Sequence, residues 1–301
     1  MQHKISIIIP TIEENGVFSI IKEIRRALGK ECEIIVVDKS SDAYYRSVKR
    51  TGVKVIRQRD SGVENAIMLG LRSARGNMLA SIDADNTHDV SGLVKGIGMV
   101  RSGEADLVLG NRLSDMEKGA MNLYIKIGNS ALSWLYARFY KAKVHDILTG
   151  LFVMNRKAFE SIREIEPYRA GIAFFAIELA KRGFKIKEVN IRYYKRAEGR
   201  SKLARSKFAY GVGVASHIVR QIRDYSPLLV FGVIGVVFIA VGAAIGAMVI
   251  LQFLSTGVFT EIGRAFISFM LIVLGILSIM TGFILDLLLE IEKRLDELKR
   301  R

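Results

Sequence analysis

Two long tracts without a charged residue, 225–260 and 265–285, constrain the fold of this chain more than any other feature. Crossing a hydrocarbon core of about 30 Å takes about 20 apolar residues in a helix, and both tracts reach that length. Only the segment from Glu261 to Arg264 separates them. Because this break is long enough to reverse the chain but too short for a domain, the sequence predicts a transmembrane hairpin.

Basic residues gather on both flanks of the hairpin, and the excess behind the formal net charge of +15 lies largely there. Because cytoplasmic flanks of membrane helices carry more Lys and Arg, both ends of the chain are predicted to be cytoplasmic. Each such side chain near anionic headgroups contributes about 1 kcal/mol. The residues are Lys195, Arg196, Arg200, Lys202, Arg205, Lys207, Arg220 and Arg223 before the hairpin, and Lys293, Arg294, Lys299, Arg300 and Arg301 after it.

Composition argues against several other classes of protein. Nucleic-acid binding is not predicted, because aromatic residues do not interleave with Lys and Arg and no zinc-knuckle spacing occurs. The single cysteine, Cys32, excludes an internal disulfide and suits a reducing compartment. The first residues show no signal-peptide pattern. The alternative for the two tracts is a pair of buried helices in a soluble protein, but such helices seldom run this long without a charge.

From residue 4 to about 110, short β-branched runs alternate with stretches that have apolar residues at helical spacing. Strand, helix, strand in regular order predicts an α/β fold with a mostly parallel, Rossmann-like sheet and right-handed crossovers. The predicted strands are 4–10, 33–37, 53–57, 78–82 and 106–109, and the predicted helices are 17–28, 41–50, 63–75 and 90–101.

The rest of the chain is less regular before the hairpin and helical around it. Val214, Ile218 and Ile222 follow an i, i+4, i+8 stripe, which predicts an interfacial helix before the first span. The predicted organisation begins with an α/β domain, 1–205, which includes helices 122–140 and 172–182 and strands 151–154 and 185–194. It continues with a juxtamembrane helix, 206–226, a hairpin, 227–289, with spans 227–254 and 265–285, and a cytoplasmic helical tail, 290–301.

Acidic residues fall where predicted strands end. Asp83 and Asp85 follow one strand directly, while Glu13 and Asp38 follow two others. Because ligands of open parallel sheets bind beyond the carboxyl ends of the strands, these residues are predicted to share one site. Two carboxylates separated by one residue suit Mg²⁺ or Mn²⁺ beside a diphosphate. His88 follows closely, and a lone histidine there is interpreted as a hydrogen-bonding loop residue.

Several motifs occur in an order that resembles family-two glycosyltransferases with a GT-A fold. The later motifs resemble the branch that makes polyprenyl-phosphate sugars, the dolichyl- or undecaprenyl-phosphate mannose and glucose synthases. The similarity spans about residues 4–205, and the hairpin resembles the two-helix anchor of bacterial and archaeal members. The motifs are Pro10-Thr11-Ile12-Glu13-Glu14, Val36-Val37-Asp38, Arg59-Asp60-Ser61-Gly62, Asp83-Ala84-Asp85-Asn86-Thr87-His88, Gly110-Asn111-Arg112, Asp146-Ile147-Leu148-Thr149-Gly150-Leu151-Phe152 and Arg196-Ala197-Glu198-Gly199-Arg200-Ser201-Lys202-Leu203.

This resemblance implies an inverting transfer of a hexose from GDP-mannose or UDP-glucose to a polyprenyl phosphate at the cytoplasmic membrane face. It implies Mg²⁺ or Mn²⁺ as cofactor and a nucleotide sugar and a lipid phosphate as partners. The implied roles are catalysis by Asp85, Asp146 and Arg112, metal binding by Asp83, Asp85 and Thr87, nucleotide binding by Pro10, Thr11, Glu13, Asp38, Asp60 and Asp83, and acceptor-phosphate binding by Arg112, Arg196, Arg200 and Lys202.

Some of these residues also allow simpler interpretations. Arg196, Arg200 and Lys202 would also suit lipid headgroups, Asp146 would cap a turn, and Glu13 would favour the positive end of a helix. The chain departs from the family pattern at Lys39, where an acidic residue is usual, at Ile12, where an aromatic residue is frequent, at Thr149, where serine is more usual, and at Thr87, where glutamine often helps to hold the metal. These departures bear on the nucleotide more than on the reaction class.

The sequence also bears on two other functions and on assembly. A processive polysaccharide synthase usually carries a Q-x-x-R-W motif, which the sequence lacks because Trp134 is preceded by Leu132-Ser133. A catalytically impaired, nucleotide-sugar-binding membrane scaffold is the remaining alternative. Gly242 and Gly246 form a small-xxx-small pattern, which either closes the hairpin internally or joins protomers of a homo-oligomer.

Overall fold

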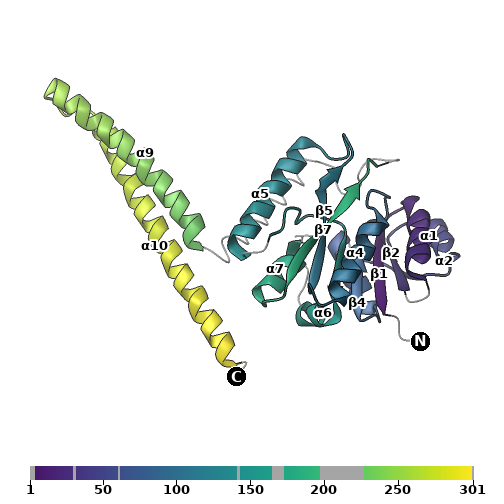
Figure 1. The fold of residues 1–301 in the computed structure, drawn as a ribbon. Helices are drawn as coiled ribbons and strands as arrows, with labels where there is room; N and C mark the ends of the chain where they lie inside the picture. The colour runs from purple at the N-terminus through teal and green to yellow at the C-terminus, as the bar shows by residue number, and fades with distance from the viewer. Residues whose placement is uncertain are drawn as a thin grey trace. The chain divides into compact units, whose positions relative to one another are not determined.

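The computed structural model describes residues 4–29, 32–59, 62–140, 143–164, 173–196 and 227–299. The chain divides into two compact units, Met1–Gly211 and Val212–Arg301. Each unit is described by itself below (Figure 1). The predicted juxtamembrane helix, 206–226, lies outside the described residues.

A seven-stranded sheet with the order β3-β2-β1-β4-β6-β5-β7 is the framework of the first unit. β1 pairs in parallel with β2 and β4, β2 with β3, and β5 with β7. β6 runs antiparallel to both of its neighbours, β4 and β5. The prediction of a mostly parallel α/β sheet is therefore confirmed. The strands are β1 Ile5–Thr11, β2 Cys32–Asp38, β3 Lys54–Arg57, β4 Met78–Ser81, β5 Leu107–Met116, β6 Phe152–Asn155 and β7 Ile186–Tyr193.

Helices cover both faces of this sheet (Figure 1). α1 and α4 pack on one face, where their apolar residues join one cluster with alternate residues of β1. α3 packs on the other face against β1 and β2, and a Cβ at Gly70 would lie 2.5 Å from Cγ2 of Ile8. The helices are α1 Gly16–Leu28, α2 Asp42–Lys49, α3 Val63–Ser73, α4 Val90–Arg101, α5 Leu123–Tyr140, α6 Arg156–Ile162 and α7 Ala173–Lys181.

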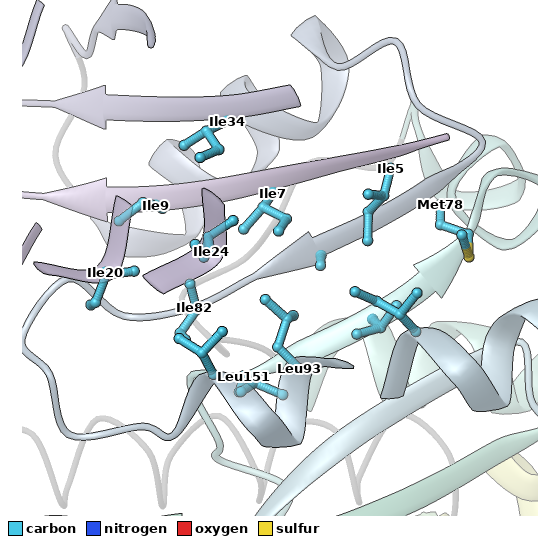
Figure 2. Close-up of a cluster of buried hydrophobic side chains, with 14 of the residues drawn as sticks. Ile5, Ile7, Ile9, Ile20, Ile24, Ile34, Met78, Ile82, Leu93 and Leu151 are labelled. Carbon is cyan, nitrogen blue, oxygen red and sulfur yellow. The ribbon is translucent and has the colours of Figure 1, made fainter. Parts of the chain in front are cut away.

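The central strand β1 is buried along its whole length. Since successive side chains of a strand point to opposite faces, Ile7 and Ile9 meet Ile20 of α1 and Leu93 of α4, as Figure 2 shows. Ile8 points to the opposite face, toward α3. A strand covered on both faces reads as a continuous apolar run, which is why this segment was predicted from its sequence.

Two elements differ from the sequence prediction. β6 follows a loop that ends near Gly150, beside the carboxyl end of β4, so the chain enters the sheet from that edge and runs antiparallel. α6, which was not predicted, begins directly after β6. Its N-cap is Asn155, whose side chain accepts a hydrogen bond of 2.7 Å from the backbone N–H of Ala158.

The second unit contains two long helices, α9 (Pro227–Thr256) and α10 (Ile262–Lys299). By length and composition they include two candidate membrane spans, Val230–Thr256 and Ile262–Leu289. The helices pack along their length through small residues, as is common between membrane helices. A Cβ at Gly235 would lie 2.5 Å from the carbonyl oxygen of Gly275, and a Cβ at Gly275 would lie 2.6 Å from that of Gly235.

The small-xxx-small pattern noted in the sequence lies at this same helix contact. A Cβ at Gly242 would lie 2.9 Å from the backbone oxygen of Ser268, and a Cβ at Gly246 would lie 2.7 Å from Oγ of Ser268. The Ser268 hydroxyl also donates a 2.7 Å hydrogen bond to the carbonyl of Gly242. The pattern therefore closes the hairpin internally, which was one of the two alternatives that the sequence left open.

Replacing Gly235 by leucine should lower the thermal stability of the full-length protein in detergent, by about 1–3 kcal/mol, because the side chain would separate α9 from α10. Gly232→Leu is the matched control, since a Cβ there meets nothing within 4 Å. The measurement is the unfolding midpoint by circular dichroism. Equal shifts for the two variants would contradict the close packing at Gly235.

Candidate active site

The carboxyl ends of β1, β2 and β4 lie side by side at one edge of the sheet, and they bring the predicted site residues together. Thr11 ends β1 and pairs in register with Asp38, which ends β2. Asp83 follows the end of β4, which pairs with β1. A parallel sheet places all such ends at one edge, and the site is built there.

Asp83, Asp85 and His88 form a cluster whose potential ligand atoms all lie within 4.8 Å of one another. The loop that holds them turns at Asn86, which has a positive φ of 59°. The Nδ1 atom of His88 lies 3.7 Å from Oδ2 of Asp83. The sequence analysis interpreted His88 as a hydrogen-bonding loop residue. In the structure its ring is buried beside the two carboxylates.

Thr87 orients one of the carboxylates. Its hydroxyl donates a 2.6 Å hydrogen bond to Oδ1 of Asp85, and its backbone N–H donates a 3.2 Å bond to the same oxygen. The sequence resemblance implies that Thr87 is a metal ligand. The structure shows that Thr87 also makes hydrogen bonds to the carboxylate of Asp85. The hydroxyl also lies 3.2 Å from Nδ1 of His88.

The electrostatics of the cluster favour a cation. Burial and repulsion from Asp85 raise the pKa of Asp83 to about 7, against the attraction of Arg112 and Arg196. Its side chain keeps an exposed fraction of 36 %, so solvent moderates the cost of burial. Burial and the charge of Arg112 lower the pKa of His88 to about 4, so this imidazole is neutral at pH 7. The two carboxylates are oxygen ligands of the kind that Mn²⁺ and Mg²⁺ prefer, and the neutral imidazole adds no positive charge that would repel the cation.

Gly150 packs directly against the metal-ligand candidate Asp83. A Cβ at this glycine would overlap the carboxylate of Asp83. The glycine therefore lets the loop before β6 approach the end of β4, and it fixes the side from which Asp83 enters the cluster.

Replacing Gly150 by alanine should weaken Mn²⁺ binding by about 10- to 100-fold, because the new methyl group displaces Asp83. Gly98→Ala is the control, since it lies on α4 and a Cβ there meets nothing within 4 Å. Titration calorimetry with Mn²⁺ measures both variants. Unchanged affinity in Gly150→Ala would show that Asp83 does not bind the cation.

A second feature of the site is the pair of Arg112 and Asp146. The Arg112 guanidinium donates to both carboxylate oxygens of Asp146, over 2.7 Å from Nε and 2.8 Å from Nη2. Nη2 also donates to the carbonyl of Leu148 over 2.8 Å, and the guanidinium lies over the ring of Tyr193. This bidentate geometry holds Arg112 in one orientation.

Asp146 stays ionised although it is fully buried. Burial alone would raise its pKa, but the hydrogen bonds and charge of Arg112 outweigh it, and with a hydrogen bond from Asn129 they hold the pKa below its usual range. The Asn129 side chain donates to Oδ1 of Asp146 over 2.6 Å. Asp146 therefore fixes the position of the Arg112 guanidinium.

Glu188 of β7 supports this pair and was not found from the sequence. Its Oε1 accepts hydrogen bonds from the backbone N–H groups of His145, at 2.7 Å, and Asp146, at 2.8 Å. Its Oε2 lies 2.8 Å from Nδ1 of His145. The Glu188 side chain is only 8 % exposed, which indicates a structural role. The fold shows that it holds the loop with His145 and Asp146.

Arg196 lies between Glu14 and the cluster of Asp83, Asp85 and His88. Its Nη2 lies 2.5 Å from Oε1 of Glu14, and its Nη1 lies 3.8 Å from Oδ2 of Asp85. The predicted acceptor-phosphate residue is thus beside the predicted metal site. Arg200 and Lys202, which the sequence assigns to the same role, lie outside the described residues.

The predicted nucleotide residues lie at the ends of β1 and β2. Asp38 is buried, and its Oδ2 accepts a 2.9 Å hydrogen bond from Arg57. Glu13, with a positive φ of 48°, donates its backbone N–H to Oγ of Ser40 over 2.7 Å. Thr11 lies 3.0 Å, by its hydroxyl, from the hydroxyl of Tyr44. Pro10 precedes Thr11 in β1, whereas Asp60 lies outside the described residues.

Solved structures with a similar fold include two sugar-phosphoglycerate synthases. Glucosyl-3-phosphoglycerate synthase of Mycobacterium tuberculosis, in complex with Mn²⁺, uridine diphosphate and phosphoglyceric acid, matches with a TM-score of 0.57 and 21 % identity. The match covers 72 % of this chain and 78 % of that one. At this identity the likeness shows the GT-A fold and confirms the predicted fold class.

Sequence comparisons with known proteins agree with the fold. A low-salt glycan biosynthesis hexosyltransferase of Haloferax volcanii is 32 % identical over 66 % of this chain, but the chain spans only about half of it, 49 %. A dolichyl-phosphate hexose transferase of the same organism is 30 % identical, over 69 % of this chain and 89 % of the relative. Dolichol-phosphate mannosyltransferase of Pyrococcus furiosus is 28 % identical, over 77 % and 68 %. The family model for glycosyl transferase family 2 matches residues 6–163, and the chain therefore belongs to that family.

Proposed function

We propose that this glycosyltransferase is metal-dependent and moves a hexose from a nucleotide-diphosphate sugar, GDP-mannose or UDP-glucose, to a polyprenyl phosphate with inversion. The observation that carries the proposal is the meeting of the Asp83/Asp85 pair with the two cations Arg112 and Arg196 at one sheet edge. The candidate membrane spans and the relatives named for dolichyl phosphate support a lipid acceptor.

The cofactor in this proposal is Mg²⁺ or Mn²⁺, held by Asp83 and Asp85 with His88 as a third donor. The raised pKa of Asp83 and the neutral imidazole fit a divalent cation, because burial and the repulsion between the carboxylates outweigh the attraction of Arg112 and Arg196, and a bound cation would add positive charge. Bound there, the metal would stabilise the negative charge of the departing nucleoside diphosphate. A structural neighbour was solved with Mn²⁺ and uridine diphosphate, which supports this assignment.

The acceptor chemistry requires cations more than it requires a base. A lipid phosphate oxygen is already anionic at neutral pH, so the protein has to bind and orient it rather than deprotonate it. Arg112, fixed by Asp146, and Arg196, beside Asp85, are the cations for that role. The ends of β1 and β2, with Thr11 and Asp38, are left for the nucleoside.

The catalytic unit is proposed to lie on the cytoplasmic side of the membrane. The basis is the concentration of Lys and Arg before and after the two candidate spans. Nucleotide sugars would then reach the sheet edge from the cytoplasm, while the lipid phosphate would arrive from the adjoining leaflet.

The test uses the full-length protein in proteoliposomes with Mn²⁺, a panel of nucleotide sugars, and dolichyl or undecaprenyl phosphate. Lipid-linked sugar should form, as read by mass, and nucleoside diphosphate should be released only when a polyprenyl phosphate is present. EDTA should abolish both signals and excess Mn²⁺ should restore them. Donor binding without turnover on any lipid would favour the scaffold alternative, and transfer to water alone would overturn the lipid acceptor.

A further inference from the structure

Tyr193, the last residue of β7, lies between the two parts of the candidate active site. It forms an isolated antiparallel bridge with His88, so the end of β7 pairs with the loop that holds the metal-ligand candidates. Beside this bridge, the backbone N–H of Tyr194 donates to the carbonyl of Thr87 over 2.9 Å. β7 also pairs with β5, the strand that carries Arg112. One strand end therefore contacts both the metal loop and the strand of the proposed phosphate-binding cation.

The hydroxyl of Tyr193 is connected to a carboxylate of the metal cluster through one other side chain. Tyr193 makes a hydrogen bond with the side chain of Thr87. The Thr87 hydroxyl donates its own proton to Oδ1 of Asp85 over 2.6 Å, so it accepts from Tyr193. Burial and the charge of Asp85 raise the pKa of Tyr193 against the charge of Arg112, so the phenol is protonated at pH 7 and can donate. These two hydrogen bonds form a relay from Tyr193 through Thr87 to Asp85.

The ring of Tyr193 contacts two further residues of the site. It meets the ring of His88 edge to face, with the ring centroids 5.3 Å apart. The Arg112 guanidinium lies over it, with Cζ 5.4 Å from the ring centroid. An aromatic ring attracts a cation at this distance through the negative charge of its face. Asp146 holds the same guanidinium by two hydrogen bonds, so Tyr193 adds a second restraint on the position of Arg112.

The relay gives Thr87 a function that suits its chemistry. This residue stands where the family often has a glutamine that helps to hold the metal. A threonine hydroxyl reaches less far than a glutamine amide, but it can accept one hydrogen bond and donate another. Between Tyr193 and Asp85 it does both, so the carboxylate of Asp85 is held by a partner that is itself fixed. Partners of metal ligands that orient them in this way raise the affinity for the metal.

We propose that Tyr193 is a positioning residue that holds the metal site and the phosphate-binding cation in one arrangement. Its hydroxyl orients Asp85 through Thr87, and its ring supports the guanidinium of Arg112. The inference rests on the proposed function, which supplies the metal and the lipid phosphate. Because the hydroxyl and the ring act on different groups, substitutions that remove one or both of them separate the two effects.

Removing only the hydroxyl tests the relay, and the readout does not require catalysis. Tyr193→Phe should weaken Mn²⁺ binding by about tenfold, because Thr87 and Asp85 lose a fixed partner. Thr87→Val should weaken binding by at least as much, and adding Tyr193→Phe to it should change the affinity no further. Calorimetric titration of the full-length protein in detergent with Mn²⁺ measures all three variants. Losses that add in the double variant would overturn the relay through Thr87, and an unchanged affinity in Tyr193→Phe would overturn the role of the hydroxyl.

Removing the ring as well tests the support of Arg112. Tyr193→Leu should raise the KM for a polyprenyl phosphate in proteoliposomes by about three- to tenfold, whereas Tyr193→Phe should leave this KM unchanged at saturating Mn²⁺. The matched control is Tyr194→Phe, since Tyr194 is 37 % exposed and its ring lies under the guanidinium of Arg192. This control should change neither the Mn²⁺ affinity nor the KM. A KM in Tyr193→Leu equal to that of the wild type would overturn the support of Arg112.

Two further results separate this inference from a structural role and from the proposed function. Tyr193→Phe should keep the thermal unfolding midpoint of the wild type. A lower midpoint, with equal losses of Mn²⁺ affinity and of acceptor binding, would show a structural role and overturn the inference. Absence of transfer to any lipid phosphate in the unmodified protein would instead contradict the proposed function, and the Mn²⁺ titrations would still decide whether Tyr193 orients Asp85. Failure of the unmodified protein to bind Mn²⁺ would overturn both.

Discussion

Replacing Asp85 by asparagine should lower the kcat of sugar transfer by about 10³-fold while the protein stays folded. The substitution keeps the shape of the side chain, and the hydrogen bond from the Thr87 hydroxyl can still be accepted. It removes one of the two charges that would hold the metal. Metal stabilisation of a leaving group is worth several kcal/mol, and each 1.4 kcal/mol corresponds to a tenfold change in rate. Initial rates at saturating donor and Mn²⁺ measure the effect.

The matched control is Asp89→Asn, four residues further along the same loop. Asp89 caps α4 by accepting a 2.8 Å hydrogen bond from the backbone N–H of Ser91. Asparagine caps helices about as well as aspartate, so this variant should keep both its stability and its transfer rate. Transfer by Asp85→Asn at the wild-type rate would remove the metal role from the Asp83/Asp85 pair. Equal losses in both variants would point to a general effect of charge in the loop.

The strands of the first unit were predicted well where both faces of the sheet are covered. β1 begins and ends only one residue later than the predicted strand 4–10. The prediction was close because an apolar run such as Ile7-Ile8-Ile9 is typical of a buried strand. β5 was predicted only as 106–109, yet it continues to Met116. Its extension is mostly polar, and pairing with β7 holds it in strand conformation. A local sequence pattern does not show this pairing.

The carboxylates of the site could be predicted because a parallel sheet gathers strand ends at one edge. Their supporting residues could not, because long-range contacts decide their roles. His88 is buried by packing against Tyr193, with ring centroids 5.3 Å apart. Glu188 reaches the Asp146 loop from another strand, and Asn129 reaches it from α5. A buried polar residue on a helix gives no sign in the sequence of the partner that it meets.

The structure shows where the residues that depart from the family pattern near the end of β1 lie. Ile12 is 45 % exposed at the end of β1, where it presents an aliphatic rather than an aromatic surface. Asp38 is held by Arg57, which also pairs with Asp42 and lies over the ring of Tyr45. The proposed nucleoside end of the site therefore contains an ion-pair network that fixes Asp38. Donor choice is expected to follow from this end, whereas the candidate metal ligands Asp83 and Asp85 follow β4.

Replacing Arg112 by methionine should lower the free energy of unfolding by about 3–5 kcal/mol and abolish transfer to lipid, because the buried Asp146 carboxylate loses its counter-ion. The pH dependence gives a specific sign. In the wild type the pKa of Asp146 is lowered, so its stabilising contribution is present above about pH 4 and is lost as the pH falls further. Without Arg112, burial should raise the pKa of Asp146. Protonation of Asp146 then removes the unpaired buried charge that destabilises the variant. The stability gap should therefore narrow as the pH is lowered from about 8 to about 5.

Denaturant unfolding of the full-length protein in detergent, followed by circular dichroism, measures this gap. Arg101→Met is the control, since Arg101 is exposed on α4 and such surface changes stay within about 0.5 kcal/mol. A gap that is constant with pH would mean that the loss comes from packing of the arginine side chain rather than from the unpaired carboxylate. An unfolding midpoint equal to the wild type would mean that the buried Asp146 carboxylate does not need Arg112 as a counter-ion. Arg196 would then be the better candidate for the cation that binds the lipid phosphate.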